Sequence, residues 1–214
     1  MYATCDVVVL ISGNGGNLQA LIDSRLTGYR SVRIVAVVSN RSDAYGLQRA
    51  KDVGIATRYL DHKVFECRED FDRALIELID AFNPQLVVLA GFMCILSADF
   101  VRNYEGRLLN IHPSLLPKHK GMYTHQRVLE AGDSEHGCSV HFVTEELDSG
   151  HLVVQAVVPV ESTDSARILA QRVHTQERRI YPLAVHWFAE GRLILGKQGA
   201  LLDGKLISHS VHSI

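Results

Sequence analysis

The sequence VVVLISGNGGN at residues 7–17 joins a short apolar run to a glycine-rich turn (residues 13–17). Short runs of β-branched residues and leucine are typical of strands that are buried on both faces of a sheet. The run stops abruptly at Gly13, and a helix is expected to begin at about Asn17. A buried strand, a glycine turn and a helix in this order indicate the first unit of a parallel α/β sheet.

The glycine-rich turn is also a candidate anion site. Glycines let the backbone approach an anion closely, and the helix that follows offers unpaired N–H groups and the positive end of its dipole. A phosphate is therefore the natural ligand for Gly15, Gly16 and Asn17. NAD is not expected, because the dinucleotide fingerprint needs glycine where Leu18 stands and an acid where Asn40 ends the next strand. A tight turn without a ligand is the alternative.

Apolar runs and helical patterns continue to alternate as far as residue 111. Further strands are expected at 32–39, 56–60, 86–90 and 108–111. The clearest helix spans about 66–82, where apolar residues recur at three- and four-residue spacing before the stop signal Asn83-Pro84. This alternation predicts right-handed crossovers and a mostly parallel, doubly wound, Rossmann-like sheet with flanking helices.

The second part of the chain has a different pattern. Two longer strands are expected at 137–144 and 152–160, followed by a long helix at 164–188 that Ser162-Thr163-Asp164 would cap. Pro182 is expected to kink or reset that helix, and a hairpin should follow. Because no repeat or linker interrupts the pattern, one domain is expected over residues 1–214.

The composition is that of an ordinary globular protein. The 214 residues include 22 Lys and Arg against 24 Asp and Glu, for a net charge of −2. This balance excludes a basic nucleic-acid-binding module. The most apolar stretch, Leu86–Leu96, is too short to cross a bilayer, and the first residues lack a basic signal region. With four scattered cysteines, the sequence predicts a cytoplasmic protein with reduced thiols and no membrane or nucleic-acid partner.

A second motif follows the fifth expected strand, in the segment NIHPSLLP at residues 110–117. Ligands of open parallel sheets gather at the carboxyl ends of strands, which is where this segment falls. Asn110 and His112 are two residues apart, so on an extended chain they project to the same side. An amide that donates to an oxyanion and an imidazole that moves a proton together suit acyl transfer. The alternative is a strand end whose Asn110 and His112 only satisfy backbone groups.

The third motif is the acidic turn TEELDSG at residues 144–150. A carboxylate from this turn could reach His112, hold its tautomer and favour the imidazolium. The alternative is a solvated β-turn, for which Asp148-Ser149-Gly150 has suitable residues. No metal is expected, because His136, Cys138 and His141 match no standard metal spacing. Since no nucleophile-elbow sequence is present either, direct transfer between two bound substrates is favoured over a covalent hydrolase.

Taken in this order, the three motifs make the chain resemble the phosphoribosylglycinamide formyltransferases, a folate-dependent formyltransferase family. The resemblance extends from residues 7–15 through 86–96 and 108–117 to 175–177 and 180–182. Its most specific part is the segment 110–117 together with the later Asp148. It implies a single formyltransferase domain, with a phosphate-binding N-terminal half and a C-terminal half that completes the folate pocket.

The activity that this resemblance implies is a step of purine biosynthesis. In the family, 10-formyltetrahydrofolate donates its formyl group to the amine of glycinamide ribonucleotide, through a tetrahedral intermediate and without a metal or NAD. The implied partners are therefore two small molecules, and the implied assembly is a monomer or a homodimer. By this resemblance Asn110 polarises the formyl oxygen, His112 is the general acid, and Asp148 supports the histidine.

The resemblance also implies residues that bind the two substrates. Gly15, Gly16 and Asn17 would hold the acceptor phosphate, and Glu177 would bind its ribose. The folate pocket would be lined by Arg68, Met93, Cys94, Ile95, Leu96, Asn110, Thr144 and Asp148, with Arg68 meeting the glutamate tail. The chain departs from the family at Gly16, where a small hydroxyl residue is frequent, and at Cys94, where bacterial members often have arginine.

Two rival functions follow from parts of this pattern. Formyltetrahydrofolate hydrolases and methionyl-tRNA formyltransferases are similar around His112-Pro113-Ser114, but those families generally add a further domain. A non-catalytic module that binds a phosphosugar or nucleotide would need the glycine-rich turn alone. That module leaves Asn110, His112 and Asp148 without a role. Glu177 and Arg68 also have a simpler interpretation, as parts of solvated, charged helix faces.

Overall fold

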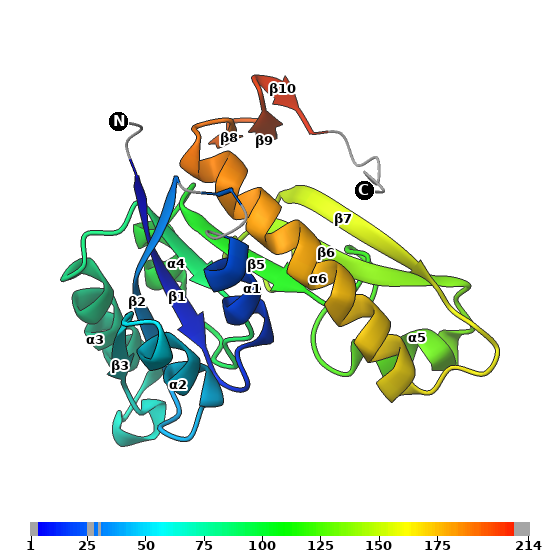
Figure 1. The fold of residues 1–214 in the computed structure, drawn as a ribbon, viewed down its shortest axis with the longest axis horizontal. Coiled ribbons are helices and arrows are strands. Elements are labelled where there is room, and N and C mark those ends of the chain that lie inside the picture. Colours follow the sequence, from blue (N-terminus) through cyan, green and yellow to red (C-terminus); the bar gives the residue numbers. More distant parts are fainter. Residues whose placement is uncertain (1–3, 25–27, 30, 208–214) are drawn as a thin grey trace. The chain divides into compact units, whose positions relative to one another are not determined.

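The computed structural model describes residues 4–24, 28–29 and 31–207 (Figure 1). The chain divides into two compact units, Met1–Leu109 and Asn110–Ile214. The division falls within strand β5 (Leu108–His112), so this strand begins in the first unit and ends in the second. The expectation of a single domain stays a prediction.

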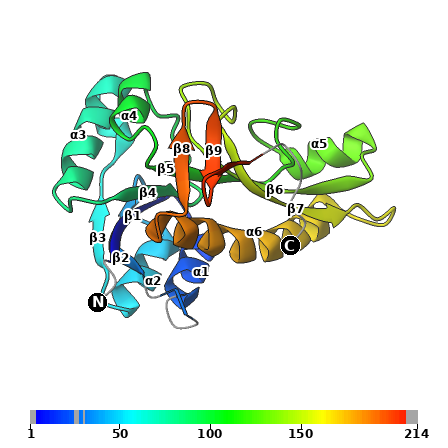
Figure 2. The same ribbon diagram turned by 90° about the horizontal axis from the view of Figure 1, so that it is seen from above.

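The N-terminal unit alternates strands and helices. In chain order its elements are β1 (Cys5–Ile11), α1 (Gly16–Ser24), β2 (Val32–Ser39), α2 (Tyr45–Asp52), β3 (Ala56–Tyr59), the 3-10 helix η1 (His62–Val64), α3 (Arg68–Asp80), β4 (Leu86–Leu89), α4 (Ala98–Asn103) and the start of β5. The strand order is β3-β2-β1-β4, and the neighbouring pairs β3-β2, β2-β1 and β1-β4 are all parallel. Figure 2 shows α1 and α2 on one face of these strands and α3 and α4 on the other.

The core of this unit lies in the strands that the apolar runs predict. Residues Val8 to Ile11 of β1 are completely buried, and all four residues of β4 are buried. Helix α3 begins at Arg68 and ends at Asp80, two residues inside each predicted end. Cys67 before it has an extended backbone, and Asn83 after it has a positive φ of 47°.

The C-terminal unit contains the antiparallel part of the sheet. After β5 its elements are α5 (Thr124–Ala131), β6 (Glu135–Phe142), β7 (Leu152–Pro159), α6 (Ala166–Ala189), β8 (Leu193–Gly196), β9 (Gly199–Leu202) and β10 (Lys205–Leu206). Strand β6 pairs antiparallel with β7, with a register irregularity between Val140 and His141. Helix α6 packs on β6 and β7, and β8 to β10 form a small antiparallel sheet. The predicted fold class, a mostly parallel Rossmann-like α/β sheet with flanking helices, is confirmed.

Helix α6 differs from its prediction at two points. Its cap is Ser165, whose hydroxyl accepts a hydrogen bond from the Ile168 N–H, rather than a residue of 162–164. Asp164 instead forms an ion pair with Arg172 at 2.8 Å, so its carboxylate is not available as the cap. The helix continues through Pro182 to Ala189, so the proline does not reset it. Within the described ranges, no helix combines the length and the apolar character that a membrane span requires.

Candidate functional site

Strand β5 positions two of the three predicted catalytic side chains, all of which belong to the C-terminal unit. His112, its last residue, is 7% exposed, and Asn110 is partly buried. The Nδ1 atom of His112 lies 3.5 Å from Oδ2 of Asp148. Its Nε2 atom lies 3.1 Å from the carbonyl oxygen of His119. Each ring nitrogen of His112 therefore faces an oxygen atom that can accept a hydrogen bond.

Asp148 is held against His112 and is buried, although residues 145–147 of the same turn are exposed. It is 9% exposed and adopts a left-handed backbone conformation with φ of 50°. The N–H of Gly121 donates to its Oδ2 atom over 2.8 Å. Lys120, next to Gly121, also joins its segment to the acidic turn, because its ammonium group contacts Glu146 at 3.2 Å and Ser149. The alternative of a free acidic turn is therefore wrong for Asp148.

Thr144 lies at the start of the same turn. Its hydroxyl donates to the carbonyl oxygen of Glu146 over 3.3 Å, and the residue is partly exposed. This bond shapes the turn that carries Asp148. The binding role that the resemblance implies for Thr144 stays a prediction.

His141 is a site residue that its sequence pattern indicated only as part of a strand. It lies in β6, as predicted, and is 2% exposed. Its side chain also contacts a predicted catalytic residue, because its Nε2 atom is 3.1 Å from Nδ2 of Asn110. Its Nδ1 atom is 3.1 Å from the Phe142 carbonyl oxygen, which can only accept, so Nδ1 carries the proton. Nε2 then accepts from the Asn110 amide. Burial lowers the pKa of His141 to about 4, which keeps the ring neutral and able to accept.

These contacts bring Asn110, His112 and Asp148 together in the C-terminal unit. His112 faces Asp148 directly, and His141, which accepts from the Asn110 amide, lies beside the same carboxylate, with its Nε2 atom 4.0 Å from Oδ1 of Asp148. The arrangement places an amide donor, a buried imidazole and a buried carboxylate at the end of β5. This is the set of groups that stabilises an oxyanion and supplies a proton in acyl transfer.

Glu177 lies on α6 and is 4% exposed, so its interpretation as part of a solvated helix face is wrong. Its Oε2 atom is 3.0 Å from Nδ1 of His174, and this hydrogen bond raises the pKa of His174. Burial, together with the charge of Glu177, raises the pKa of Cys138 on β6. A buried carboxylate on this helix is a candidate acceptor for hydroxyl groups.

In the N-terminal unit, the glycine-rich turn has a conformation that requires glycine. Gly15 has a φ of 73°, and a Cβ there would lie 2.7 Å from the Cα of Gly46 on α2. The N–H of Gly46 donates to the Gly13 carbonyl over 3.1 Å. Gly16 and Asn17 are the first two residues of α1, where backbone N–H groups point toward the N-terminal end of the helix. The turn therefore has the backbone geometry of an anion site.

Arg49 on α2 is a second residue that sequence reasoning missed. Its Nε donates to the Asn14 carbonyl over 2.8 Å, and its Nη2 lies 3.2 Å from the Asn14 side-chain oxygen. The guanidinium thus holds the glycine-rich turn and adds a positive charge beside it. The two residues are 35 positions apart, so no local pattern could have indicated this contact.

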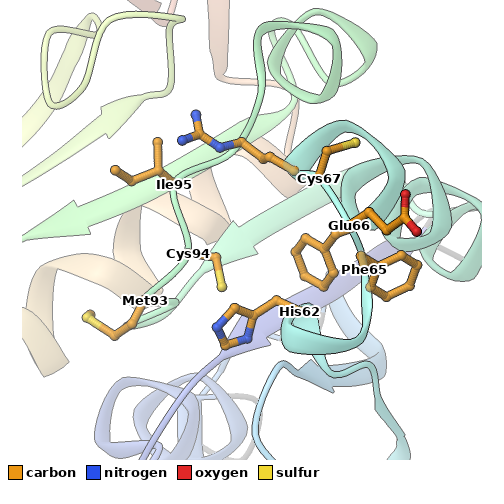
Figure 3. Close-up of a pocket in the computed structure, with 9 residues that line it drawn as sticks. His62, Phe65, Glu66, Cys67, Met93, Cys94 and Ile95 are labelled. Carbon is orange, nitrogen blue, oxygen red and sulfur yellow. The ribbon is translucent and has the colours of Figure 1, made fainter.

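The N-terminal unit also contains a pocket of about 390 Å³ (Figure 3). It is lined by His62, Phe65, Glu66, Cys67, Arg68, Phe71, Met93, Cys94 and Ile95. Four of the predicted folate-binding residues, Arg68, Met93, Cys94 and Ile95, therefore line it. Leu96 is not among the lining residues. Two aromatic rings, exposed apolar side chains and one guanidinium fit a ligand that combines an aromatic system with a carboxylate.

No group of three or more His, Cys, Asp or Glu with metal-binding geometry occurs in the part of the chain that the structure describes. His136 does not take part in such a group. Its Nε2 atom lies 2.9 Å from Nδ1 of His125, and burial lowers its pKa to about 4.

The fold and these side chains match one class of proteins. A family model described as formyl transferase matches residues 5–185, and the chain therefore belongs to the formyl transferase family.

Within this class, the relatives with high similarity have two names. The chain is 56% identical to the phosphoribosylglycinamide formyltransferase of Escherichia coli over 200 residues, which cover 94% of each chain. It is 45% identical to the Homo sapiens trifunctional purine biosynthetic protein adenosine-3 over 91% of this chain and 19% of that protein. Among solved structures, phosphoribosylglycinamide formyltransferase from Coxiella burnetii superposes with a TM-score of 0.94 at 48% identity, covering 98% and 99% of the two chains.

Proposed function

We propose that this protein transfers the formyl group of 10-formyltetrahydrofolate to the amine of glycinamide ribonucleotide in purine biosynthesis. The observation that carries the proposal is the near full-length similarity to enzymes named phosphoribosylglycinamide formyltransferase. The arrangement of Asn110, His112 and Asp148 supports the same chemistry independently.

The N-terminal unit offers groups for both small molecules. We assign the acceptor phosphate to the N–H groups of the glycine-rich turn at Gly15, Gly16 and Asn17, because a helix N-terminus stabilises an anion there. Where Gly16 lacks a side-chain donor, the nearby guanidinium of Arg49 supplies positive charge. We assign the acceptor ribose to the buried carboxylate of Glu177 in the C-terminal unit.

The folate donor supplies the formyl carbon, and the pocket of the N-terminal unit fits its aromatic and carboxylate parts. Phe65, Phe71, Met93 and Ile95 provide apolar and aromatic surface, and Arg68 can pair with a carboxylate of the glutamate tail. With Cys94 rather than arginine in this pocket, Arg68 is the one arginine or lysine among its lining residues.

Asn110 stabilises the negative charge that develops on the formyl oxygen. One N–H of its amide donates to His141, so the second N–H of the same nitrogen is directed away from that ring and can donate to the oxygen. A fixed donor costs no reorganisation when the charge appears, which is why such donors have large effects on rate.

His112 moves the proton that the departing nitrogen requires. A protonated His112 would be flanked by the Asp148 carboxylate at 3.5 Å and by the His119 carbonyl at 3.1 Å. Asp148 balances the positive charge, and its own position is held by the Gly121 N–H. Transfer from Nε2 requires that His112 exchange its bond to the His119 carbonyl for a bond to substrate or to a bridging water.

A direct assay tests the proposed function. The protein is mixed with 10-formyltetrahydrofolate, with and without glycinamide ribonucleotide, and the deformylated folate is followed by absorbance. We expect turnover that depends on the acceptor. Equal turnover without the acceptor would identify a hydrolase, and no turnover under either condition would leave only a binding function; both results contradict the proposal.

A further inference from the structure

Two buried polar side chains connect the glycine-rich turn with the pocket of the N-terminal unit. Ser12 follows β1 and Asn40 follows β2, and their exposed fractions are 4% and 5%. The Ser12 hydroxyl donates to the Asn40 side-chain oxygen over 2.6 Å. Strands β1 and β2 are parallel neighbours, so both residues stand at the carboxyl edge of the sheet, where ligands of such sheets bind.

The same pair of side chains contacts the wall of the pocket. The N–H of Met93 donates to the Ser12 hydroxyl over 2.7 Å. The Asn40 amide nitrogen lies 3.0 Å from Sγ of Cys94 and 3.4 Å from Nδ1 of His62. Met93, Cys94 and His62 all line the pocket, and Figure 3 shows them grouped on one side of it. Two separate segments of the pocket wall are therefore joined to one amide.

On the other side, Ser12 is continuous with the glycine-rich turn. Its neighbour Gly13 accepts a hydrogen bond from the Gly46 N–H, and Arg49 holds the following residue Asn14. The start of the turn is thus held both by α2 and, one residue earlier, by the Ser12–Asn40 pair. Because one peptide bond joins Ser12 to Gly13, a displacement of Ser12 would also displace the start of the turn.

The segment between β4 and α4 needs such polar contacts to keep its shape. It contains Met93 and Ile95, which are 63% and 59% exposed and so contribute little burial. Its first part is held by Ser12 and Asn40, and near its end the Ser97 N–H donates to Asp72 over 2.5 Å. The oxygen and the nitrogen of the Asn40 side chain both have partners, and a network of paired polar groups rigidifies its surroundings.

We propose that Ser12 and Asn40 are positioning residues that hold the glycine-rich turn and the pocket wall in binding geometry at the same time. One buried pair then sets the affinity for the phosphate of the acceptor and the affinity for the folate donor. This inference rests on the proposed function, which assigns the turn to the acceptor phosphate and the pocket to the donor.

The first test measures both KM values in Ser12→Ala and in Asn40→Leu. Either substitution leaves buried partners without a hydrogen bond, so we expect KM for the acceptor and KM for the donor to rise together, each on the order of tenfold. We expect kcat to change less than KM. Ser24→Ala is the matched control, because Ser24 is also buried and bonded, but at the end of α1, and it should leave both KM values unchanged.

Two further variants separate this inference from the proposed function. Arg49→Met should raise only the acceptor KM, and Arg68→Met only the donor KM. If neither variant shows its effect, the proposed binding roles are wrong. If both do, but Ser12→Ala raises one KM or neither, the proposed function stands and the shared positioning role is rejected. The double variant Ser12→Ala/Asn40→Leu should be no worse than either single variant, because both remove one network.

A measurement on the unsubstituted protein keeps the inference testable if the variants fold poorly. Amide hydrogen exchange is compared with and without ribose 5-phosphate as a phosphosugar probe. We expect the probe to slow exchange at Asn17 in the turn and also at Met93 in the pocket wall. Slower exchange at Asn17 with no change at Met93 would overturn the inference. No change at either position would instead contradict the phosphate role of the turn.

Discussion

At the scale of single residues, the orientation of one amide group determines what the site can do. The Asn110 side chain can present either its nitrogen or its oxygen to a reacting group, and only the nitrogen can stabilise an oxyanion. His141 selects the nitrogen, because its Nδ1 proton is committed to the Phe142 carbonyl and its Nε2 atom can only accept. The low pKa of His141, about 4, keeps this acceptor available at neutral pH.

Replacing His141 should therefore affect turnover more than binding. In His141→Phe the Asn110 amide loses its acceptor, and we expect kcat to fall by about tenfold while both KM values change little. His141→Gln can still offer an oxygen to the amide and should retain more of the activity than His141→Phe. Steady-state kinetics of the two variants provide the measurement. Equal losses in both, or a loss confined to KM, would show that His141 does not orient Asn110.

At the scale of elements, the junction between β1 and α1 depends on close packing against α2. The backbone at Gly15 has a positive φ, and an added Cβ would meet the backbone of Gly46, so neither strain nor contact can be relieved by a side-chain movement. The same helix α2 contributes Arg49, which holds the turn from outside. The shape of the turn is therefore a property of two helices as well as of its own glycines.

Gly15→Ala tests this packing. We expect it to lower the free energy of unfolding by about 1–3 kcal/mol, because it adds backbone strain and a close contact, and to raise the acceptor KM. Gly54→Ala is the matched control, because Gly54 has the same φ of 73° and nothing within 4 Å of an added Cβ. Urea unfolding of both variants gives the comparison. A Gly15→Ala variant as stable as Gly54→Ala would refute the packing argument.

The elements also show which features could be predicted from the sequence. Strand β2 has its predicted bounds, and Asn110, His112 and the glycine-rich turn could be named as candidates because each pattern involves only neighbours in the chain. The contact between His141 and Asn110 could not be found in this way, since it depends on how β6 aligns beside β5 and on the irregularity at residues 140 and 141.

Contacts between residues far apart in the sequence also determine the burial of Glu177 and the hydrogen bonding of Arg49. Glu177 stands beside Arg178 and Arg179 in the sequence, which indicated a solvated face, yet its own side chain faces inward. Arg49 gave no signal at all, because its partner Asn14 lies in a different βα unit. The resemblance named Glu177 as a site residue, whereas Arg49 was missed; in both cases tertiary contacts, and not local patterns, determine whether the side chain is buried or paired.

At the scale of the whole molecule, buried histidines couple stability to pH. Burial lowers the pKa of both His136 and His141 to about 4, against about 6.5 in the unfolded chain. Between these pH values the unfolded chain binds more protons than the folded chain, so acid favours unfolding. The stabilisation is complete above about pH 6.5 and is lost progressively as the pH falls toward 4.

Urea titrations at several pH values test this coupling. We expect the unfolding midpoint of the unsubstituted protein to fall between about pH 6.5 and 4. His136→Leu removes one of the two groups and should flatten this dependence, whatever its effect at pH 7. His151→Asn, which replaces an exposed histidine, should keep the original slope. A slope that is unchanged in His136→Leu would contradict the assignment.

The most direct test of the account concerns the two side chains at the end of β5. Asn110→Ala and His112→Ala each remove a group that acts at the reacting centre, and the loss of one oxyanion donor typically costs about 10²–10³ in rate. The measurement is kcat for formyl transfer to glycinamide ribonucleotide, with circular dichroism as the check on folding. We expect each folded variant to lose at least two orders of magnitude in turnover. Unchanged turnover in either folded variant would contradict the central claim that the Asn110 amide and the His112 imidazole perform the chemistry.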